Sequence, residues 1–445
     1  MSIFHSNSEI QRVQNQKLRE MLLICQRGHP YYKELWSKSN IDISEIKTTE
    51  DLGRLPLTHK QALMENPESF RLQLQDLPMQ ERILWEVIYT TGTTSEPTPF
   101  YNTTHDYHNY LFQSKRVAEI SGINSTDVIA NLFPLTTAPM GAYVRSVTNA
   151  YAAGATIFAA LPGAKNGTHD LQRSMEECIR LIEQNRPTIL WGIPSFLRRL
   201  LIKAIELKAD FQHVRMCAIT GEASSMAMRD EIRRCLKTLN TQDQIVFDRY
   251  GSTELGAFAQ CSQESDWHNP TPEAQFHEVV DIESGQRLPN GERGALAVTH
   301  LDRRGTVLIR FLVGDNVSIA NDACPNCGRL GDRIVGPVTR AKDLVKVKGM
   351  LINPSVLLSS IQTLSGIDEF QVVVCKSDAN DPFSMDDLRV RIATHVADQH
   401  QLTHQLIETI KSAIKVTPSI DIVTIEDIFN VAKHAKVQRF IDARN

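Results

Sequence analysis

The sequence has no long hydrophobic run, no surplus of positive charge and few cysteines for its length. Among its 445 residues, of which 42% are hydrophobic, no apolar run approaches the ~20 residues that span a bilayer. The segment from Met1 to Asn7 lacks a basic stretch followed by an apolar one, so we expect no secretory signal. These absences argue against a membrane protein and against an exported one.

The charge balance and the cysteines argue against further classes. A net charge of −4 and an isoelectric point of about 6.4 give no overall basic field that would recruit nucleic acid. Eight cysteines without an export signal favour reduced thiols over a disulfide framework. We therefore expect a cytoplasmic protein with neither nucleic acid nor a membrane as partner. The oligomeric state stays open, and a homodimer is one alternative.

The order of the predicted elements indicates an α/β fold. Helical patterns dominate the first ~75 residues, for example over 9–26, and short apolar runs then alternate with helices up to residue 236. Such alternation predicts a mostly parallel sheet with helices on both faces. The expected strands are 83–88, 128–133, 155–160, 188–191 and 215–219, and the expected helices are 171–185, 196–207 and 225–236.

The pattern changes twice in the rest of the chain. After about residue 275, strands and turns predict a β-rich subdomain, and from residue 343 a new α+β pattern begins. A chain of this length is also too long for one core. We therefore expect a large N-terminal domain over 1–339, with mostly parallel sheets and the β-rich subdomain, and a small mobile C-terminal α+β domain over 340–445.

The segment from Tyr89 to Thr98 is rich in hydroxyl side chains around Gly92. Glycine lets the backbone turn, and clustered hydroxyls and N–H groups can wrap an anion. The loop is not a Walker A sequence, because the Gly-Lys-Ser/Thr ending is missing. We expect it, like the turn from Thr220 to Ser224, at the carboxyl end of a strand of the parallel sheet, where nucleotides bind. A plain turn between strands is the alternative.

Further motifs follow this loop in a fixed order. They are Asp248-Arg249-Tyr250-Gly251-Ser252-Thr253-Glu254, Gly314-Asp315, Arg340-Ala341-Lys342-Asp343 and Lys436-Val437-Gln438-Arg439-Phe440-Ile441-Asp442-Ala443-Arg444. In these motifs, over residues 85–445, the chain resembles the adenylate-forming (acyl-activating) superfamily, most closely its phenylacetate–CoA ligase branch. That branch shares the T/S-G-T-T loop, a Tyr-Gly-x-x-Glu motif, a Gly-Asp pair and a terminal Lys-x-x-Arg-x-x-Asp-x-Arg.

The resemblance implies an ATP-dependent ligase. Such an enzyme joins a carboxylic acid to the α-phosphate of ATP, releases pyrophosphate, and passes the acyl group to a thiol, here most simply that of coenzyme A. Mg²⁺ and positioned donors stabilise the charge that develops on the phosphates. Two alternatives stay open: transfer to an acyl carrier protein, a partner cysteine or an amine, and a non-catalytic, zinc-stapled protein that only binds ATP.

The resemblance also implies a role for each matching residue. Thr253 would contact the α-phosphate, Glu254 would ligate Mg²⁺, and Lys436 would join the carboxylate and the α-phosphate during adenylation. Lys342 would be the point about which the small domain rotates. The nucleotide-binding residues would be Thr91, Gly92, Thr93, Thr94, Gly221, Glu222, Ala223, Asp248, Tyr250, Gly251, Asp315 and Arg340.

The loop and the acid pocket set this chain apart from its family. The family loop continues as Gly-Lys-Pro, whereas Glu96 replaces the base here and would repel a triphosphate. The segment corresponding to the acid pocket offers aromatic and apolar walls, which favours an aromatic or compact apolar acid. The alternative is that these side chains belong to the core. The pocket residues are Phe133, Tyr143, Trp191 and Pro194.

The pair Cys324 and Cys327 forms a C-x-x-C knuckle followed by Gly328. In a cytosolic chain such a pair favours a metal over a disulfide, and a tetrahedral zinc needs two more ligands. The resemblance points to Cys261 and His268, because the phenylacetate–CoA ligase branch often shows this set. A Cys₃His site would be structural, since no position is left for water. The competing donors are His277, Cys217 and Cys235, and free thiols are the other alternative.

Overall fold

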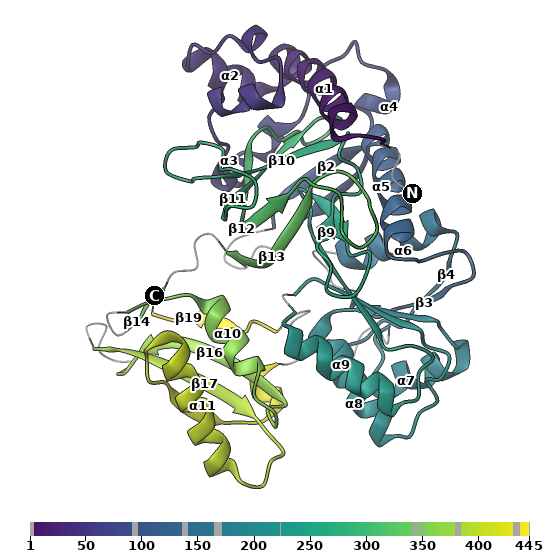
Figure 1. Ribbon diagram of the computed structural model, residues 1–445, viewed down its shortest axis with the longest axis vertical. Coiled ribbons are helices and arrows are strands. Elements are labelled where there is room, and N and C mark those ends of the chain that lie inside the picture. Colours follow the sequence, from purple (N-terminus) through teal and green to yellow (C-terminus); the bar gives the residue numbers. More distant parts are fainter. Residues whose placement is uncertain are drawn as a thin grey trace.

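The computed structural model describes residues 4–90, 97–135, 141–163, 171–222, 224–340, 345–347, 350–378, 384–429 and 437–444. These residues form a large lobe and a smaller C-terminal lobe, which lies beside helices α8 and α9 of the large one (Figure 1). Within these ranges, none of the helices combines the length and the apolar character that crossing a membrane requires.

One mixed sheet of eleven strands runs through the described part of the large lobe. Five neighbouring strands are parallel: β4 (Thr156–Ala159), β3 (Val128–Asn131), β5 (Ile189–Gly192), β6 (Met216–Thr220) and β7 (Ile245–Ser252). The next six are antiparallel: β8 (Gly256–Ala259), β9 (Trp267–His268), β13 (Arg333–Arg340), β12 (Phe311–Ala320), β11 (Gly294–His300) and β10 (Gln275–Val280). The predicted β-rich subdomain therefore continues the parallel sheet, because the tight turn after β7 brings β8 alongside it.

Helices cover both faces of the parallel part. Helices α7 (Met175–Asn185), α8 (Pro194–Glu206) and α9 (Met226–Thr238) lie on one face, and α5 (Thr104–Ile120) and α6 (Gly141–Ala153) on the other. Strand β6 shows the alternation that this requires. Its Cys217 and Ile219 pack with the α7–α9 side, and Met216 and Ala218 pack with the α5–α6 side.

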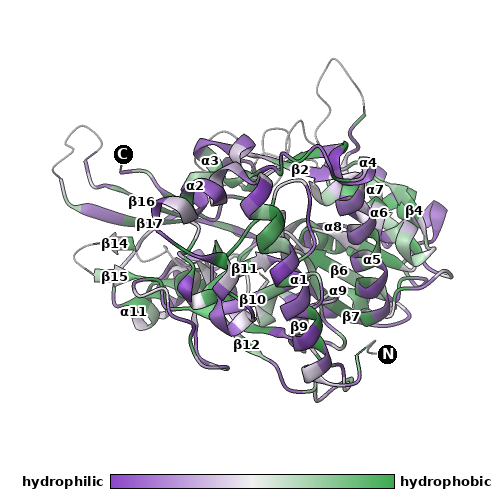
Figure 2. Ribbon diagram, turned by 90° about the horizontal axis from the view of Figure 1, so that it is seen from above, coloured by the Kyte–Doolittle hydropathy of each residue, from purple (hydrophilic) through white to green (hydrophobic). Residues whose placement is uncertain are grey.

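The N-terminal helices pack against the antiparallel part of the sheet. They are α1 (Asn7–Gly28), α2 (Pro30–Lys38) and α3 (Lys60–Glu65), with short 3₁₀ turns η1 (Ile43–Glu45), η2 (Thr49–Arg54) and η3 (Pro67–Phe70). The short α4 (Met79–Arg82) lies against α5 and β2 instead. Helix α1 carries hydrophilic and hydrophobic residues along its length, as a helix on the outside of a core does (Figure 2). Helix α7 starts later than predicted, because Ser174 and Glu177 form a capping box before Met175.

The predicted strand 83–88 does not join the large sheet. It is β1 (Leu84–Tyr89), which pairs with β2 (Pro99–Thr103) in a separate antiparallel hairpin. The expectation that the hydroxyl-rich loop follows a strand of the parallel sheet is therefore wrong. The physical reason is that the connection between Tyr89, where β1 ends, and Pro99, where β2 begins, is shorter than the dozen or so residues that a crossover between parallel strands needs.

The C-terminal lobe has its own sheet and core. Strands β18 (Ser419–Ile422), β17 (Asp386–Ala393), β16 (Glu369–Lys376) and β19 (Phe440–Asp442) pair in that order. Helices α10 (Pro354–Gln362) and α11 (Gln399–Ile414) pack on it, with the hairpin β14 (Val345–Val347) and β15 (Met350–Ile352) and the short α12 (Ile425–Ile428). The buried side chains of α10, α11, β16 and β17 form one cluster.

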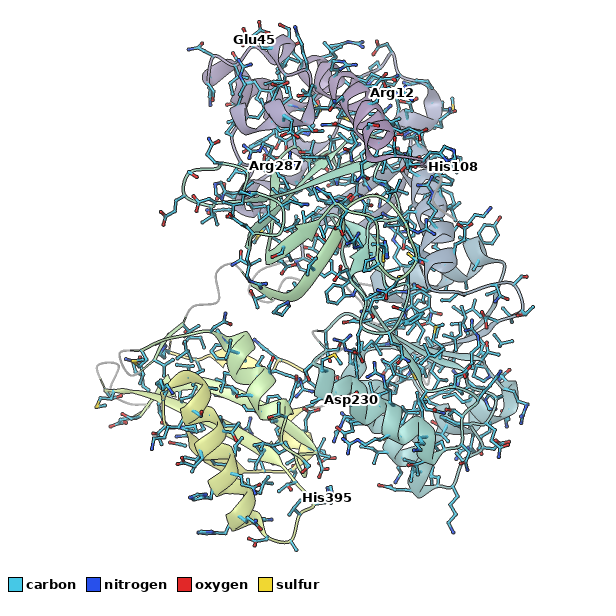
Figure 3. The ribbon with its side chains drawn as sticks, viewed as in Figure 1. Arg12, Glu45, His108, Asp230, Arg287 and His395 are labelled. Atoms are coloured by element: carbon cyan, nitrogen blue, oxygen red, sulfur yellow. The ribbon has the colours of Figure 1, made fainter. Side chains whose placement is uncertain are left out.

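Arg198 of helix α8 links the two lobes. Its Nη1 donates to the carbonyl oxygen of Asp368 at 2.8 Å, its Nη2 donates to that of Ile367 at 3.3 Å, and its Nε lies 2.7 Å from Glu231 of α9. Figure 3 labels Asp230 on α9 and His395 on the small lobe, and the His395 ring contacts the Asp368 carboxylate at 2.7 Å. The small lobe thus meets the large one at the start of β16.

A fully buried ion pair anchors the antiparallel part of the sheet. The Nε and Nη2 atoms of Arg310 lie 2.8 and 3.2 Å from the two carboxylate oxygens of Glu278. The same guanidinium donates to the carbonyl oxygens of Leu55 and Gly285. Arg310 therefore ties the N-terminal segment to β10.

Breaking this ion pair is expected to destabilise the large lobe. Glu278→Gln leaves a buried guanidinium without a charge partner, which should lower the free energy of unfolding by about 3 kcal/mol. Glu50→Gln is the matched control, because Glu50 pairs with Arg287 at the surface and should change stability by less than ~1 kcal/mol. Urea denaturation followed by tryptophan fluorescence measures the stability of both variants. The signal reports on the large lobe, because all tryptophans precede residue 268. Equal stabilities would contradict the prediction.

Candidate active site

Tyr250 and Asp315 meet across the curled sheet. Four strand positions separate β7 from β12, which would be ~19 Å in a flat sheet. Nevertheless the Tyr250 hydroxyl donates to an Asp315 carboxylate oxygen at 2.8 Å, and Asp315 is only 7% exposed. Arg340 stands opposite Asp315 in the register of β12 and β13. The curl therefore brings together three of the predicted nucleotide-binding positions.

Glu254 is a buried carboxylate at the turn after β7. Its side chain is 4% exposed, and its Oε1 has no hydrogen-bond partner among the described residues; the Lys60 Nζ lies 3.5 Å from it. The His300 ring fixes the Glu254 backbone, because Nδ1 accepts from the Leu308 amide and Nε2–H donates to the Glu254 carbonyl oxygen at 2.8 Å. Burial lowers the pKa of His300 to about 3, so this ring is neutral.

The turn after β6 is fastened to β7. The Thr220 hydroxyl donates to the Arg249 carbonyl oxygen at 2.9 Å, and the Ser224 hydroxyl donates to Asp248 at 2.8 Å. Burial raises the pKa of Asp248 to about 6. Gly221 has φ +93°, a conformation that favours glycine, and Glu222 follows it. Two of the predicted nucleotide-binding segments thus share hydrogen bonds.

Glycine is required at position 251. A Cβ atom there would lie 2.2 Å from the carbonyl oxygen of Gly256 on the antiparallel neighbour β8. The close approach of the two strands positions Thr253 and Glu254 in the turn that joins them. The close packing of β7 against β8 therefore explains why the second residue of the Tyr-Gly-x-x-Glu motif is a glycine.

The predicted pocket residues gather on the α5–α6 side of the parallel strands. Phe133 and Trp191 meet edge to face, with ring centroids 6.4 Å apart, and Tyr143 of α6 packs on the same cluster. Pro194 is buried at the first residue of α8. Phe133, Tyr143 and Trp191 thus belong to one cluster, which fits either a pocket wall or a core layer.

Several predicted residues lie outside the described part of the chain. They are Thr91, Gly92, Thr93, Thr94, Glu96, Ala223, Lys342 and Lys436. Their roles stay predictions from the motifs.

The four predicted metal ligands converge. The ligand atoms of Cys261, His268, Cys324 and Cys327 all lie within 4.8 Å of one another. His268 is on β9, and the two cysteines of the knuckle lie in the connection from β12 to β13. Because β9 pairs with both β8 and β13, three parts of the sheet meet at this cluster.

Two distances within the cluster match those of a tetrahedral zinc site. Cys261 Sγ and Cys324 Sγ are 3.8 Å apart, and Cys327 Sγ and His268 Nε2 are 3.6 Å apart. Zn–S bonds of ~2.3 Å and Zn–N bonds of ~2.05 Å at tetrahedral angles require about 3.8 and 3.6 Å. A disulfide would need about 2.05 Å between sulfurs.

The competing donors are engaged elsewhere. The Nδ1 of His277 contacts the Asp332 carboxylate at 2.7 Å. Cys217 and Cys235 belong to the core between the parallel strands and α7–α9. The geometry therefore favours the set that the resemblance implied.

A family comparison now places the chain. The AMP-binding enzyme family matches residues 14–300. The chain belongs to this family. That membership confirms the resemblance to the adenylate-forming superfamily drawn from the motifs.

Individual relatives agree with this placement. The phenylacetate-coenzyme A ligase of Escherichia coli (strain K12) is 25% identical over 99% of this chain and 96% of its own. That of Thermus thermophilus is 22% identical over 92% of this chain and 90% of its own. The crystal structure of 2-hydroxyisobutyryl-CoA ligase in the postadenylation state matches with a TM-score of 0.81 at 21% identity, over 99% of this chain and 91% of that one. The predicted fold class is thus confirmed.

Sequence reasoning missed two charged residues of this region. Lys60 contacts Glu254 although 194 positions separate them, and nothing in the local sequence around Lys60 signals that contact. Arg249 is buried on β7, on the α5–α6 side with Phe247. The signal in the sequence is that Arg249 stands between the apolar residues of the strand, after Phe247 and before Tyr250. A charged residue at such a position indicates a buried charge.

Proposed function

We propose that the protein joins a carboxylic acid to the α-phosphate of ATP and transfers the acyl group to the thiol of coenzyme A. In the first step a carboxylate oxygen attacks the α-phosphorus, and the bond to the pyrophosphate oxygen breaks. In the second step the thiol sulfur attacks the acyl carbon, the thiol proton is lost and AMP leaves. The observation that supports the proposal is the hydrogen bond between Tyr250 and Asp315 in a chain that belongs to the AMP-binding enzyme family. Both residues lie in motifs that this chain shares with the family.

The nucleotide would lie along the carboxyl end of β7. Tyr250 would stack on the adenine, and Asp315 would accept hydrogen bonds from the ribose hydroxyls, with Arg340 beside it on β13. A buried carboxylate suits that task because it is a fixed acceptor. Thr253 would donate to the α-phosphate. The remaining contacts would come from Thr91, Gly92, Thr93 and Thr94 to the outer phosphates and from Gly221, Glu222 and Ala223 to the adenine edge.

The acid would occupy the α5–α6 side of the parallel strands. Phe133, Tyr143, Trp191 and Pro194 would hold a compact acid with an aromatic or other apolar body. Lys436 would bridge the acid carboxylate and the α-phosphate with a flexible point charge. In this proposal the lobes correspond to domains over 1–339 and 340–445, and rotation at Lys342 withdraws Lys436 after the first step.

Two metal ions belong to the proposal. Glu254 fits Mg²⁺, since its buried Oε1 is a hard oxygen donor without a hydrogen-bond partner in the described part of the chain. When bound, the ion supplies charge neutralisation for the phosphates. Cys261, His268, Cys324 and Cys327 fit a structural zinc, which would hold the turn after β8 against the antiparallel strands.

Two assays test the function. With ATP, Mg²⁺ and a panel of acids, pyrophosphate should be released only when an acid is present, and a thioester should form only when coenzyme A is added. Pyrophosphate release without consumption of coenzyme A would point to a carrier protein, a cysteine or an amine as the acceptor. No release with any acid would favour the ATP-binding protein without catalysis.

Lys60 is expected to assist the binding of ATP with Mg²⁺. Its ammonium group lies 3.5 Å from Glu254 and its side chain is 42% exposed, so it can neutralise this carboxylate and reach an incoming phosphate. Lys60→Met should raise the KM for ATP about tenfold, the scale of one charge interaction near a surface. The KM for the acid should change little. Lys33→Met, at an exposed position of α2, is the control, and an unchanged KM for ATP would contradict this role.

A further inference from the structure

Arg249 carries a buried charge that has no ion-pair partner among the described residues. Its side chain is 4% exposed, and its Cζ lies 4.1 Å from the centre of the Trp191 ring. Its closest hydrogen-bond acceptor is the Asn149 Oδ1, 3.4 Å from Nη1. Within the described ranges, Nε and Nη2 have no hydrogen-bond partner and no carboxylate lies at ion-pair distance.

Three other buried arginines of this protein have a carboxylate partner. Arg116 pairs with Glu273 at 2.6 Å, Arg198 with Glu231, and Arg310 with Glu278. Burying an uncompensated charge is costly, and burial lowers the pKa of Arg249 to about 10. Even so, the side chain is cationic at neutral pH. A buried cation that keeps its charge calls for an anion.

The free atoms of Arg249 form the fork that binds a carboxylate. Nε and Nη2 are the two donors through which Arg310 contacts both oxygens of Glu278 in this same chain. At Arg249 the same two donors have no hydrogen-bond partner in the described part of the chain. A carboxylate that approached them would meet both in parallel, with bidentate geometry.

The fork of Arg249 lies on the side of the sheet where the acid pocket is predicted. Trp191, against which the guanidinium stacks, also contacts Phe133 and has a buried Nε1 without a partner among the described residues. Asn149 of α6 lies on the same side, next to Arg249, and its side-chain amide donates to the Tyr110 hydroxyl at 3.0 Å. The region therefore combines aromatic walls with unused hydrogen-bond donors.

We infer that Arg249 binds a second carboxylate of the acid substrate, so that the enzyme activates a dicarboxylic acid. One carboxylate pairs with the fork of Arg249, and the other reacts with ATP near Thr253. The inference rests on the proposed function, whose acid pocket it refines. Four residues span at most ~14 Å of chain, which favours a short or aromatic diacid over a long-chain one.

Matched acids and variants of Arg249 test the inference. Pyrophosphate release is compared for glutarate against valerate and for isophthalate against 3-methylbenzoate. The wild type should favour the diacid of a pair by at least about tenfold in kcat/KM, the scale of a charge-assisted hydrogen bond in a buried site. Arg249→Met should remove that preference, and Arg249→Lys should keep part of it, because lysine retains the charge and loses the fork. Arg116→Met, which removes a buried guanidinium elsewhere, should leave the preference unchanged.

Calorimetry separates the inference from the proposed function. Glutarate or isophthalate should bind the wild type more tightly than Arg249→Met in the absence of ATP. Equal turnover of diacids and monoacids, with the same ratio in Arg249→Met, would overturn the inference and leave the acid activation standing. Diacid binding that depends on Arg249, without pyrophosphate release from any acid, would overturn the proposed reaction and support the carboxylate site. Absence of Arg249-dependent binding and of any diacid preference would overturn the inference. If Arg249→Met does not fold, the diacid preference and the diacid binding of the wild type and of Arg249→Lys still decide the question.

Discussion

Lys436→Ala is expected to abolish most acid-dependent pyrophosphate release. The carboxylate and the α-phosphate are both anionic, and a positioned ammonium group is needed only where they approach each other. Loss of one such electrostatic contact lowers kcat by roughly 10²–10³. Because the transfer to coenzyme A no longer brings two anions together, the variant should still use chemically supplied acyl adenylate. Initial rates of the two half-reactions, measured separately, check both expectations.

Lys433→Ala is the matched control for this test. Lys433 stands three residues before Lys436, carries the same charge and lies outside the terminal Lys-x-x-Arg-x-x-Asp-x-Arg motif. It should retain nearly wild-type rates in both half-reactions. Undiminished adenylation by Lys436→Ala, together with a loss in Lys433→Ala, would transfer the role to the other lysine.

The zinc cluster is expected to have the second large effect, on stability. Purified protein should contain about one zinc per chain, because four converging ligands define one tetrahedral site. Structural zinc contributes roughly 10–16 kcal/mol of binding energy to the folding of zinc-finger peptides. Cys261→Ser should remove one thiolate and lower the free energy of unfolding by at least about 3 kcal/mol, a fraction of that energy. Elemental analysis and urea denaturation measure the two quantities.

Cys375→Ser is the control for the metal site. Cys375 lies on β16 of the small lobe, outside the four-ligand cluster, so its replacement should leave the zinc content unchanged. Affinity for ATP should change less than stability in Cys261→Ser, since the cluster shares no ligand with the Tyr250–Asp315 pair. A metal-free protein of normal stability would contradict the structural role.

The sequence predicted the elements that depend on local pattern. The alternation of apolar runs and helices placed the parallel strands, and the spacing of Tyr250, Glu254 and Asp315 identified the family. These features can be predicted because a buried strand requires a run of apolar residues and a tight turn requires particular residue types, all within a few neighbouring positions. The metal cluster was also placed on the residues that converge, although that set came from the resemblance.

Contacts between segments that are far apart in the sequence could not be predicted from such local patterns. Strand β1 has the composition of a buried strand, but its short connection commits it to the hairpin with β2. The Lys60–Glu254 contact depends on how α3 docks against the antiparallel strands, which no local pattern encodes. Arg310 pairs with Glu278, whereas Arg249 has no carboxylate partner among the described residues. The local sequence around each arginine does not predict this difference.

The contact of Arg198 with the small lobe has a consequence for how such proteins diverge. Arg198 binds the carbonyl oxygens of Ile367 and Asp368, which every amino acid provides, whereas on its own lobe it depends on the carboxylate of Glu231. Substitutions at 367 and 368 therefore preserve the acceptors. Among homologues, positions 198 and 231 should covary with each other, and neither should covary with the residues across the boundary. Small lobes exchanged between relatives should dock through the same two main-chain atoms.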